Sequence, residues 1–203
     1  MVPLPPAESR NLWAVGARRK RAGVPEAEIL VQALRAASQG NEALIALLDA
    51  GGVAGERHLL SAWAHLGRAR QRGEVRLRDR GAEFLLFVAG DDQLPRALQK
   101  IGIGPATEEF VLVGERPREV APLLERFGLV EDPSVYPRPP TEATLDRLGI
   151  TPEERSVVPS TAWEGLVLER VALLEMSAAK SGTAPPGGPL PHRGAGARPA
   201  QKP

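Results

Sequence analysis

The chain has 203 residues, of which 42% are hydrophobic, and its formal net charge is +1. This length suits one domain, and this share of apolar residues is enough for a buried core. The absence of Cys excludes a disulfide framework, a thiol nucleophile and a Cys-ligated zinc site. The longest strongly apolar run, residues 84–89, is far shorter than the roughly 18 residues of a transmembrane helix. No signal-peptide-like apolar stretch follows the basic residues near the start, so we expect a cytoplasmic protein without a membrane partner.

The small net charge conceals basic segments. Residues 1–22 and 66–80 each carry a net charge of +4, residues 181–203 carry +3, and the remainder is acidic. A polyanion such as RNA would be attracted to these basic segments and repelled elsewhere. The alternative is that such runs of charge are ordinary solvated faces.

The first part of the chain contains three predicted elements. Residues 1–10 are rich in Pro and are expected to be flexible, and a short strand is predicted at 12–15. A helix is predicted over 25–38, because it starts with Pro, which suits a first helical turn, and is followed by a glycine. The apolar residues 43–48 form either a buried strand or a helical turn, which periodicity does not distinguish.

The middle of the chain is the most clearly patterned. Residues 51–55 form a glycine-rich loop, and the apolar residues of 56–71 recur with the period of a core-facing helix. Residues 82–89 predict a strand, because a continuous apolar run is typical of a strand that is buried on both faces. A further helix is expected to be capped by an Asp of the pair 91–92 and to end at Gly102.

The last part of the chain is predicted to be mostly helical. A strand is expected at 109–113, and a helix at 117–127. Thr151 and Thr161 each stand three residues before a Glu, which is the spacing of a capping box at a helix start. The final helix is predicted over 162–178.

These elements indicate an α/β fold in which helices pack on a small sheet. We expect a single domain over 11–178, preceded by the flexible residues 1–10. Residues 179–203 are predicted to be a disordered tail, because 181–203 contains six Pro and five Gly and cannot bury a core.

No set of side chains is typical of a catalytic or metal site. Ser61 lies between His58 and His65, but the Gly-x-Ser-x-Gly turn that exposes a nucleophilic serine is absent. The three His residues have no recognisable metal-ligand spacing. We therefore expect no enzymatic activity, no cofactor and no metal.

The glycine-rich loop has two interpretations. Residues 52–55 match the Gly-x-x-Gly of KH domains, which holds an RNA backbone, and Arg57 and His58 follow directly. Backbone N–H groups at the helix start could also receive a phosphate, although the Lys-Ser/Thr of a P-loop is absent. The alternative is a loop that uses glycine only for its turn into the helix.

Two further groups of basic residues could contact phosphates. Arg96 and Lys100 lie one helical turn apart, followed by Gly102 and Gly104. Residues 66–80 contain six arginines without interleaved aromatic side chains, so they do not form a base-stacking platform. Both groups could instead be solvated surface.

The final helix has apolar residues on two sides. One stripe, which should face the core, comprises Trp163, Leu166, Val167, Val171 and Leu174. A second stripe, Leu168, Ala172 and Met176, lies on nearly the opposite side among acidic residues. The second stripe predicts an interface with a protein partner, because so small a chain has little core left to cover it.

Several of these segments resemble one family in order and spacing. They are residues 55–62 (GERHLLSA), 84–94 (FLLFVAGDDQL), 97–103 (ALQKIGI) and 169–175 (ERVALLE). Between about 40 and 178 the chain is similar to the small regulatory subunit of the KEOPS (EKC) complex. This family includes archaeal CCA-binding subunits and the animal protein that binds the p53-related protein kinase.

The resemblance implies a non-catalytic subunit with two partners. In this family the subunit binds the small lobe of a kinase-like ATPase subunit and stimulates it, and archaeal members bind the single-stranded 3′ CCA end of tRNA. The complex transfers a threonylcarbamoyl group to the adenosine beside the anticodon. The expected function is therefore tRNA modification within a KEOPS complex.

The resemblance also suggests which residues act. Where archaeal members often have Gly-x-Arg-Gln, residues 90–93 are Gly-Asp-Asp-Gln, so a carboxylate replaces a cation that Arg96 and Lys100 could restore. The candidate RNA-binding residues are Arg57, His58, Gln93, Arg96, Lys100 and Gly102. The candidate partner interface is Leu168, Ala172 and Met176. The alternative function is a stand-alone single-stranded RNA-binding module that uses 52–55 in KH fashion, and a small-molecule enzyme is least favoured.

Overall fold

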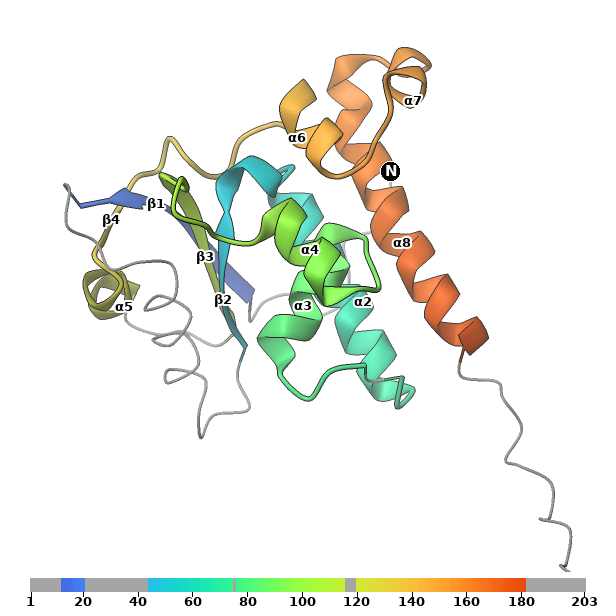
Figure 1. Ribbon diagram of the computed structural model, residues 1–203, viewed down its shortest axis with the longest axis horizontal. Helices are drawn as coiled ribbons and strands as arrows, with labels where there is room; N and C mark the ends of the chain where they lie inside the picture. The colour runs from blue at the N-terminus through green and yellow to red at the C-terminus, as the bar shows by residue number, and fades with distance from the viewer. Residues whose placement is uncertain (1–11, 21–43, 75, 116–119, 182–203) are drawn as a thin grey trace, which may run out of the picture.

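The structure is a computed structural model that describes residues 12–20, 44–74, 76–115 and 120–181. These residues form an antiparallel four-stranded sheet with helices on both of its faces (Figure 1). The predicted α/β fold, a small sheet with helices packed on it, is confirmed. The predictions for 1–10, for the helix at 25–38 and for nearly all of the tail lie outside the described residues.

The sheet combines strands that are far apart in the sequence. Its strands are β1 (Leu12–Arg19), β2 (Ile45–Asp49), β3 (Glu109–Glu115) and β4 (Leu129–Glu131). The strand order is β2-β3-β1-β4, and every neighbouring pair is antiparallel. The ambiguous apolar run 43–48 is thus mainly a strand, and the strand predicted at 12–15 continues to Arg19.

Alternate residues of β2 and β3 face two separate cores. Toward the larger set of helices point Ala46, Leu48, Val111 and Val113. Toward α5 (Val120–Arg126) point Ile45, Leu47, Phe110 and Leu112, which pack with Leu124 and Phe127. Both faces of the sheet are therefore buried, because side chains of a strand alternate between its faces.

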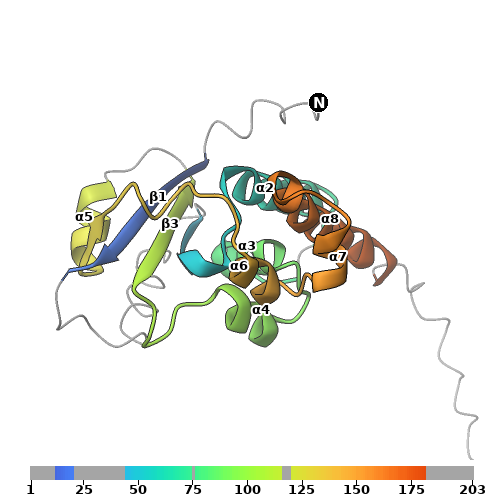
Figure 2. The same ribbon diagram turned by 90° about the horizontal axis from the view of Figure 1, so that it is seen from above.

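Three long helices form the layer on the first face. They are α2 (Glu56–Gln71), α3 (Arg80–Ala89) and α8 (Trp163–Ser181). Helix α3 lies between α2 and α4 (Leu94–Ile101), and α8 runs along α2 (Figure 2). Helix α3 also contacts β2 and α8, so it is surrounded by other elements on most sides.

The prediction of a strand at 82–89 is wrong, because this segment forms most of helix α3. The Asp79 side chain accepts the N–H of Ala82 at 2.7 Å and caps the start of the helix. At the other end Gly90 has a φ of 58°, the left-handed conformation that commonly terminates a helix. The continuous apolar run reflects a helix that is buried nearly all round rather than a buried strand.

The remaining helix starts follow the predictions in part. The capping box at Thr151 is confirmed at the start of α7 (Pro152–Ser156). Thr161 caps no helix; it lies inside the short 3-10 helix η3 (Ser160–Ala162) that leads into α8. Helix α4 begins after Gln93 without a side-chain cap, so the predicted Asp cap is also wrong. Helix α6 (Glu142–Arg147) is capped instead by a Thr pair.

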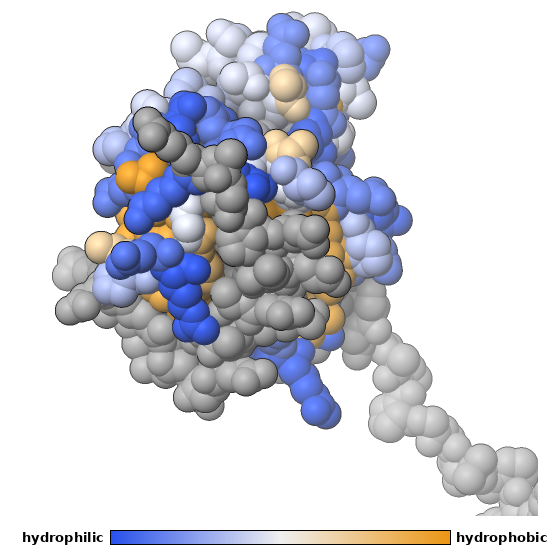
Figure 3. Space-filling view, turned by 60° about the vertical axis from the view of Figure 1, so that its left-hand side comes forward, coloured by the Kyte–Doolittle hydropathy of each residue, from blue (hydrophilic) through white to orange (hydrophobic). Residues whose placement is uncertain are grey.

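The surface on the sheet side varies in hydropathy. A space-filling view shows mostly polar residues at the top, over α6 and α7, and hydrophobic residues lower down beside segments drawn in grey (Figure 3). Among the residues that the structure describes, no helix is both long and apolar enough to span a membrane.

Candidate functional site

The loop between β2 and α2 is held in place by one carboxylate and one glycine. The Asp49 side chain accepts the N–H of Gly51 at 2.8 Å and starts the 3-10 helix η2 (Ala50–Gly52). Its second oxygen accepts a hydrogen bond from Arg147 at 3.0 Å. A Cβ at Gly52 would stand 2.6 Å from the carbonyl oxygen of Lys100, so glycine allows this loop to pack on the end of α4.

His58 belongs to the interior. Its ring has no exposed surface; Nδ1 accepts the N–H of Ala54 at 3.1 Å, and Nε2–H donates to the carbonyl of Val88 at 2.8 Å. Burial lowers the pKa of His58 to about 4, although the hydrogen bond to Val88 acts in the opposite direction. The neutral ring therefore links the glycine-rich loop to α3. The prediction that His58 contacts RNA is wrong, because both ring nitrogens are already bonded inside the protein.

The burial of residues 52–55 also contradicts the KH interpretation. Val53 is 3% exposed and Ala54 is fully buried, and the two flanking glycines are buried as well. A Gly-x-x-Gly loop that holds an RNA backbone must present its peptide groups to solvent. In this protein the loop is instead a packed connection between the sheet and α2.

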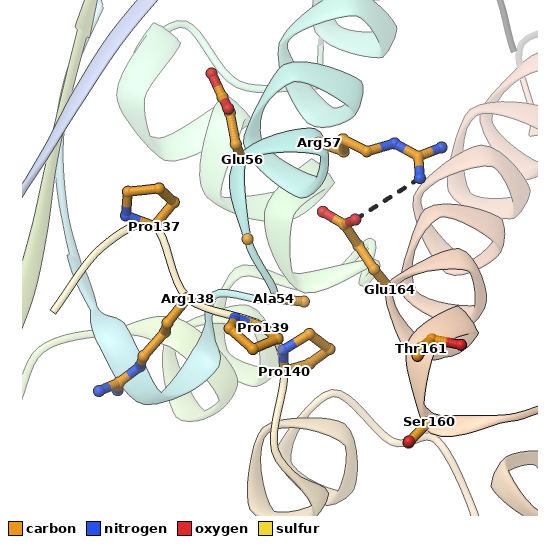
Figure 4. A pocket seen from close by; sticks show the side chains of 11 residues that line it. Ala54, Glu56, Arg57, Pro137, Arg138, Pro139, Pro140, Ser160, Thr161 and Glu164 are labelled. Atoms are coloured by element: carbon orange, nitrogen blue, oxygen red, sulfur yellow. Dashed lines mark ion pairs between the residues drawn. The ribbon is translucent and has the colours of Figure 1, made fainter. Parts of the chain in front are cut away.

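A pocket of about 380 Å³ opens where α2 begins (Figure 4). Gly55 has a φ of 121° and turns the chain into α2 at this point. The pocket is lined by Ala54, Gly55, Glu56, Arg57, Pro137, Arg138, Pro139, Pro140, Ser160, Thr161 and Glu164. Its walls thus come from the start of α2, the proline-rich segment before α6 and the start of α8.

Arg57 supplies the most accessible positive charge of this pocket. Its side chain is 58% exposed, and its ion pair with Glu164 spans 3.8 Å. The guanidinium of Arg138 points away from Arg57 and binds Glu109 at 2.5 Å (Figure 4). Burial, followed by the charges of Glu56 and Glu164, raises the pKa of the neighbouring Tyr136. Glu164 therefore compensates the charge of Arg57 only across 3.8 Å, and more than half of the Arg57 side chain stays exposed.

The predicted RNA-binding residues of α4 are tied to the acidic pair that precedes it. Arg96 binds Asp91 and Asp92 at 3.0 Å each, and Lys100 binds Asp91 at 3.1 Å. Burial raises the pKa of Asp91, but hydrogen bonds from the backbone of Gln93 and from both cations lower it more. Asp91 and Asp92 thus neutralise the two cations, Arg96 and Lys100, that were expected to contact RNA.

The six predicted RNA-binding residues do not converge on one surface. His58 is interior and Arg57 lines the pocket, whereas Gln93, Arg96, Lys100 and Gly102 are not among the residues that line it. Gln93 is exposed at the start of α4, and Gly102 ends that helix in extended backbone. Of the six candidates, Arg57 is therefore the one that lines this pocket.

The arginines of 66–80 are mostly engaged inside the protein. Arg70 binds the fully buried Glu83 at 2.8 Å, and Arg76 donates to the carbonyl of Leu174 at 3.1 Å. Arg80 binds Glu115 at 2.9 Å and lies over the ring of Trp63. These contacts give the basic segment a structural role rather than the predicted phosphate contacts.

Glu175 of α8 is the centre of the largest of these clusters. It accepts hydrogen bonds from Arg68 at 3.1 Å and from Arg72 at 2.6 Å, and its other close neighbour is His65. Burial raises the pKa of Glu175, but these hydrogen bonds lower it more strongly, to about 2. The carboxylate therefore stays ionised and connects α8 to α2.

The side of α8 that faces away from the core carries apolar residues that the described structure covers only in part. We define the outer side of α8 as the surface formed by Leu168, Glu169, Ala172, Leu173 and Met176. Leu173 is 54% exposed and Met176 is 60% exposed, while Leu168 and Ala172 are half-buried. The other stripe behaves as predicted: Val167, Val171 and Leu174 are buried in the core.

Sequence reasoning missed most of the pocket. Arg138, Ser160, Thr161 and Glu164 lie about 80 to 110 residues from Arg57, and no local pattern connects them to it. Pro137–Pro140 was visible as a proline-rich stretch, but a single sequence does not say what such a stretch packs against. Within the described part of the chain, no three His, Asp or Glu side chains are grouped to hold a metal ion.

The sequence matches no protein-family model, and no curated protein matches it either. The geometry and the sequence resemblance together are therefore the basis for the function proposed below.

Proposed function

We propose that this protein is a non-catalytic subunit of a KEOPS-type complex that modifies tRNA in the cytoplasm. It binds and stimulates the kinase-like ATPase subunit through the outer side of α8. It also receives the 3′ CCA end of tRNA, so that threonylcarbamoyl transfer takes place beside the anticodon of a bound tRNA.

The observation that carries this proposal is the exposed apolar surface on the outer side of α8. Leu173 and Met176 are each more than half exposed in a helix whose opposite side is fully used by the core. Exposed apolar surface of this kind commonly marks a protein interface. The same helix contains residues 169–175, one of the segments that resemble the KEOPS subunit family.

The pocket at the start of α2 supports the RNA part of the proposal. Single-stranded RNA ends are recognised by contacts to splayed bases and to a few phosphates. Three prolines offer apolar wall surface, and Arg57 offers an exposed cation beside them. We therefore assign the RNA end to this pocket rather than to α4, whose cations are neutralised by Asp91 and Asp92.

Docking is tested by binding of the full chain to the kinase-like ATPase subunit of the same organism. Leu168→Glu and Met176→Glu should each weaken binding at least about tenfold, because a carboxylate would be forced into an apolar contact. Val130→Glu is the matched control, since Val130 is 48% exposed on β4, away from α8. Unchanged binding of both α8 variants would contradict the proposed interface.

RNA binding is tested by a gel shift that compares intact tRNA with tRNA lacking its CCA end. Removal of CCA should abolish most of the shift, and Arg57→Gln should weaken binding of intact tRNA several-fold. Arg126→Gln on α5, which is also exposed, serves as a control for loss of one surface charge. Equal binding of both tRNAs would contradict recognition of the 3′ end.

A further inference from the structure

Glu169 lies on the outer side of α8, and no charged residue stands one helical turn away from it; the adjacent Arg170 binds Glu154 instead. The positions three and four residues away, which share its helix face, are Gly165, Leu166, Ala172 and Leu173. None of these side chains can pair with a carboxylate. The Glu169 side chain is exposed, and no ion pair joins it to any of the residues that the structure describes.

Three other carboxylates in and around α8 differ in this respect. Glu164 lies 3.8 Å from Arg57, and Glu175 binds Arg72 at 2.6 Å. Glu154 of α7 binds Arg170 of α8, also at 2.6 Å. Glu169 thus combines an exposed side chain that has no ion pair within the described part with only apolar residues or glycine one helical turn away on either side.

We infer that the protein partner covering the outer side of α8 presents a lysine or arginine that pairs with Glu169 inside an otherwise apolar contact. This inference rests on the proposed function, because it takes the kinase-like ATPase subunit as that partner. Covering Glu169 removes its carboxylate from water, which is strongly unfavourable unless a cation takes the place of the water.

The consequence is selectivity. Leu168, Leu173 and Met176 alone would accept many apolar surfaces, whereas a buried carboxylate rejects every surface that brings no cation. A complementary charge also accelerates association at low salt. The acidic residue thus distinguishes the correct partner from other apolar surfaces at little cost to the free protein, where Glu169 stays hydrated.

The test is the dissociation constant of the full chain with the ATPase subunit at low salt. Glu169→Gln should weaken binding about tenfold, and Glu169→Lys should weaken it further, because it brings two cations together. Glu125→Gln and Glu125→Lys, at an exposed helical position on α5 at the other end of the molecule, should leave binding unchanged. Added salt should weaken wild-type binding more than that of Glu169→Gln.

The outcomes separate this inference from the proposed function. If Met176→Glu loses binding while both Glu169 variants bind like wild type, the docking face stands and the charge pairing is refuted. If Met176→Glu also binds like wild type, or if the wild-type chain does not bind the ATPase subunit at all, both proposals are refuted. Restoration of Glu169→Lys binding by a Lys-to-Glu or Arg-to-Glu exchange on the partner would identify the pairing residue.

Discussion

The two sides of α8 use the same residue types in opposite ways. On the inner side, Leu174 is buried in the core, and Glu175 is bound by two side chains of α2 and by Arg72 directly after it. On the outer side, the adjacent Leu173 is 54% exposed and Glu169 has no partner among the described residues. The difference shows that residue type alone does not determine role; position around the helix decides whether a side chain stabilises the fold or remains available to a partner.

The largest expected effect compares two adjacent leucines. Leu174→Ala should lower the free energy of unfolding by about 2–4 kcal/mol, because it removes a buried side chain and leaves a cavity. Leu173→Ala should change it by less than about 0.5 kcal/mol, because the residue is mainly exposed. Urea denaturation of both variants measures the difference. Equal losses would mean that Leu173 is buried by contacts beyond the described residues.

The second comparison is between two glutamates and depends on pH. The pKa of Glu175 is lowered from 4.5 to about 2 in the folded protein, so its carboxylate stabilises the fold fully above about pH 4.5. This contribution is lost as the pH falls from about 4.5 toward 2. In this pH range Glu175 is already protonated in the unfolded state, and it becomes protonated in the folded state as well. Glu175→Gln should therefore cost about 1–3 kcal/mol at pH 7, a range reduced for solvent screening.

The measurement is the free energy of unfolding of wild type and Glu175→Gln between pH 7 and pH 2.5. The gap between the two curves should be constant above about pH 5 and should close at lower pH. Glu169→Gln, the outer-side control, should follow wild type within about 0.5 kcal/mol at pH 7. A gap that does not change with pH would show that Glu175 acts by packing rather than by charge.

The smallest expected effect concerns the outer side alone. The double variant Leu173→Gln and Met176→Gln should change the free energy of unfolding by less than about 0.5 kcal/mol, because both side chains are more than half exposed. It should also reduce self-association in sedimentation experiments, because exposed apolar surface promotes it. A loss above about 1 kcal/mol would show that the chain itself covers this side.

The sequence predicted the amphipathic elements well. Helix α2 has the predicted bounds, and α8 differs from its prediction by a few residues, because apolar residues that recur with the helical period identify a helix. Helix α3 was missed, since an all-apolar run looks the same in a buried strand and in a central helix. Asp79 and Gly90, a cap at each end, were the available signals.

The site was less predictable than the fold, because its contacts are long-range. Arg72 and Glu175 are separated by 103 positions, and nothing in either neighbourhood shows that they meet. His58 looked like a ligand-binding residue because it follows a glycine-rich loop, yet the fold directs its ring into the core. Of the outer side of α8, the stripe of Leu168, Ala172 and Met176 could be named from the sequence because a single helix contains it, whereas the exposed Leu173 was missed.

The strand order has a consequence for the growing polypeptide. Strand β1 leaves the ribosome first, but its two neighbours in the sheet are β3 and β4. Its register pairs Leu12 with Glu115 and Arg18 with Glu109, so synthesis must reach at least residue 109 before β1 finds its first partner. A nascent chain halted before residue 109 has neither neighbour, so this sheet assembles late in translation, after α2, α3 and α4 have emerged.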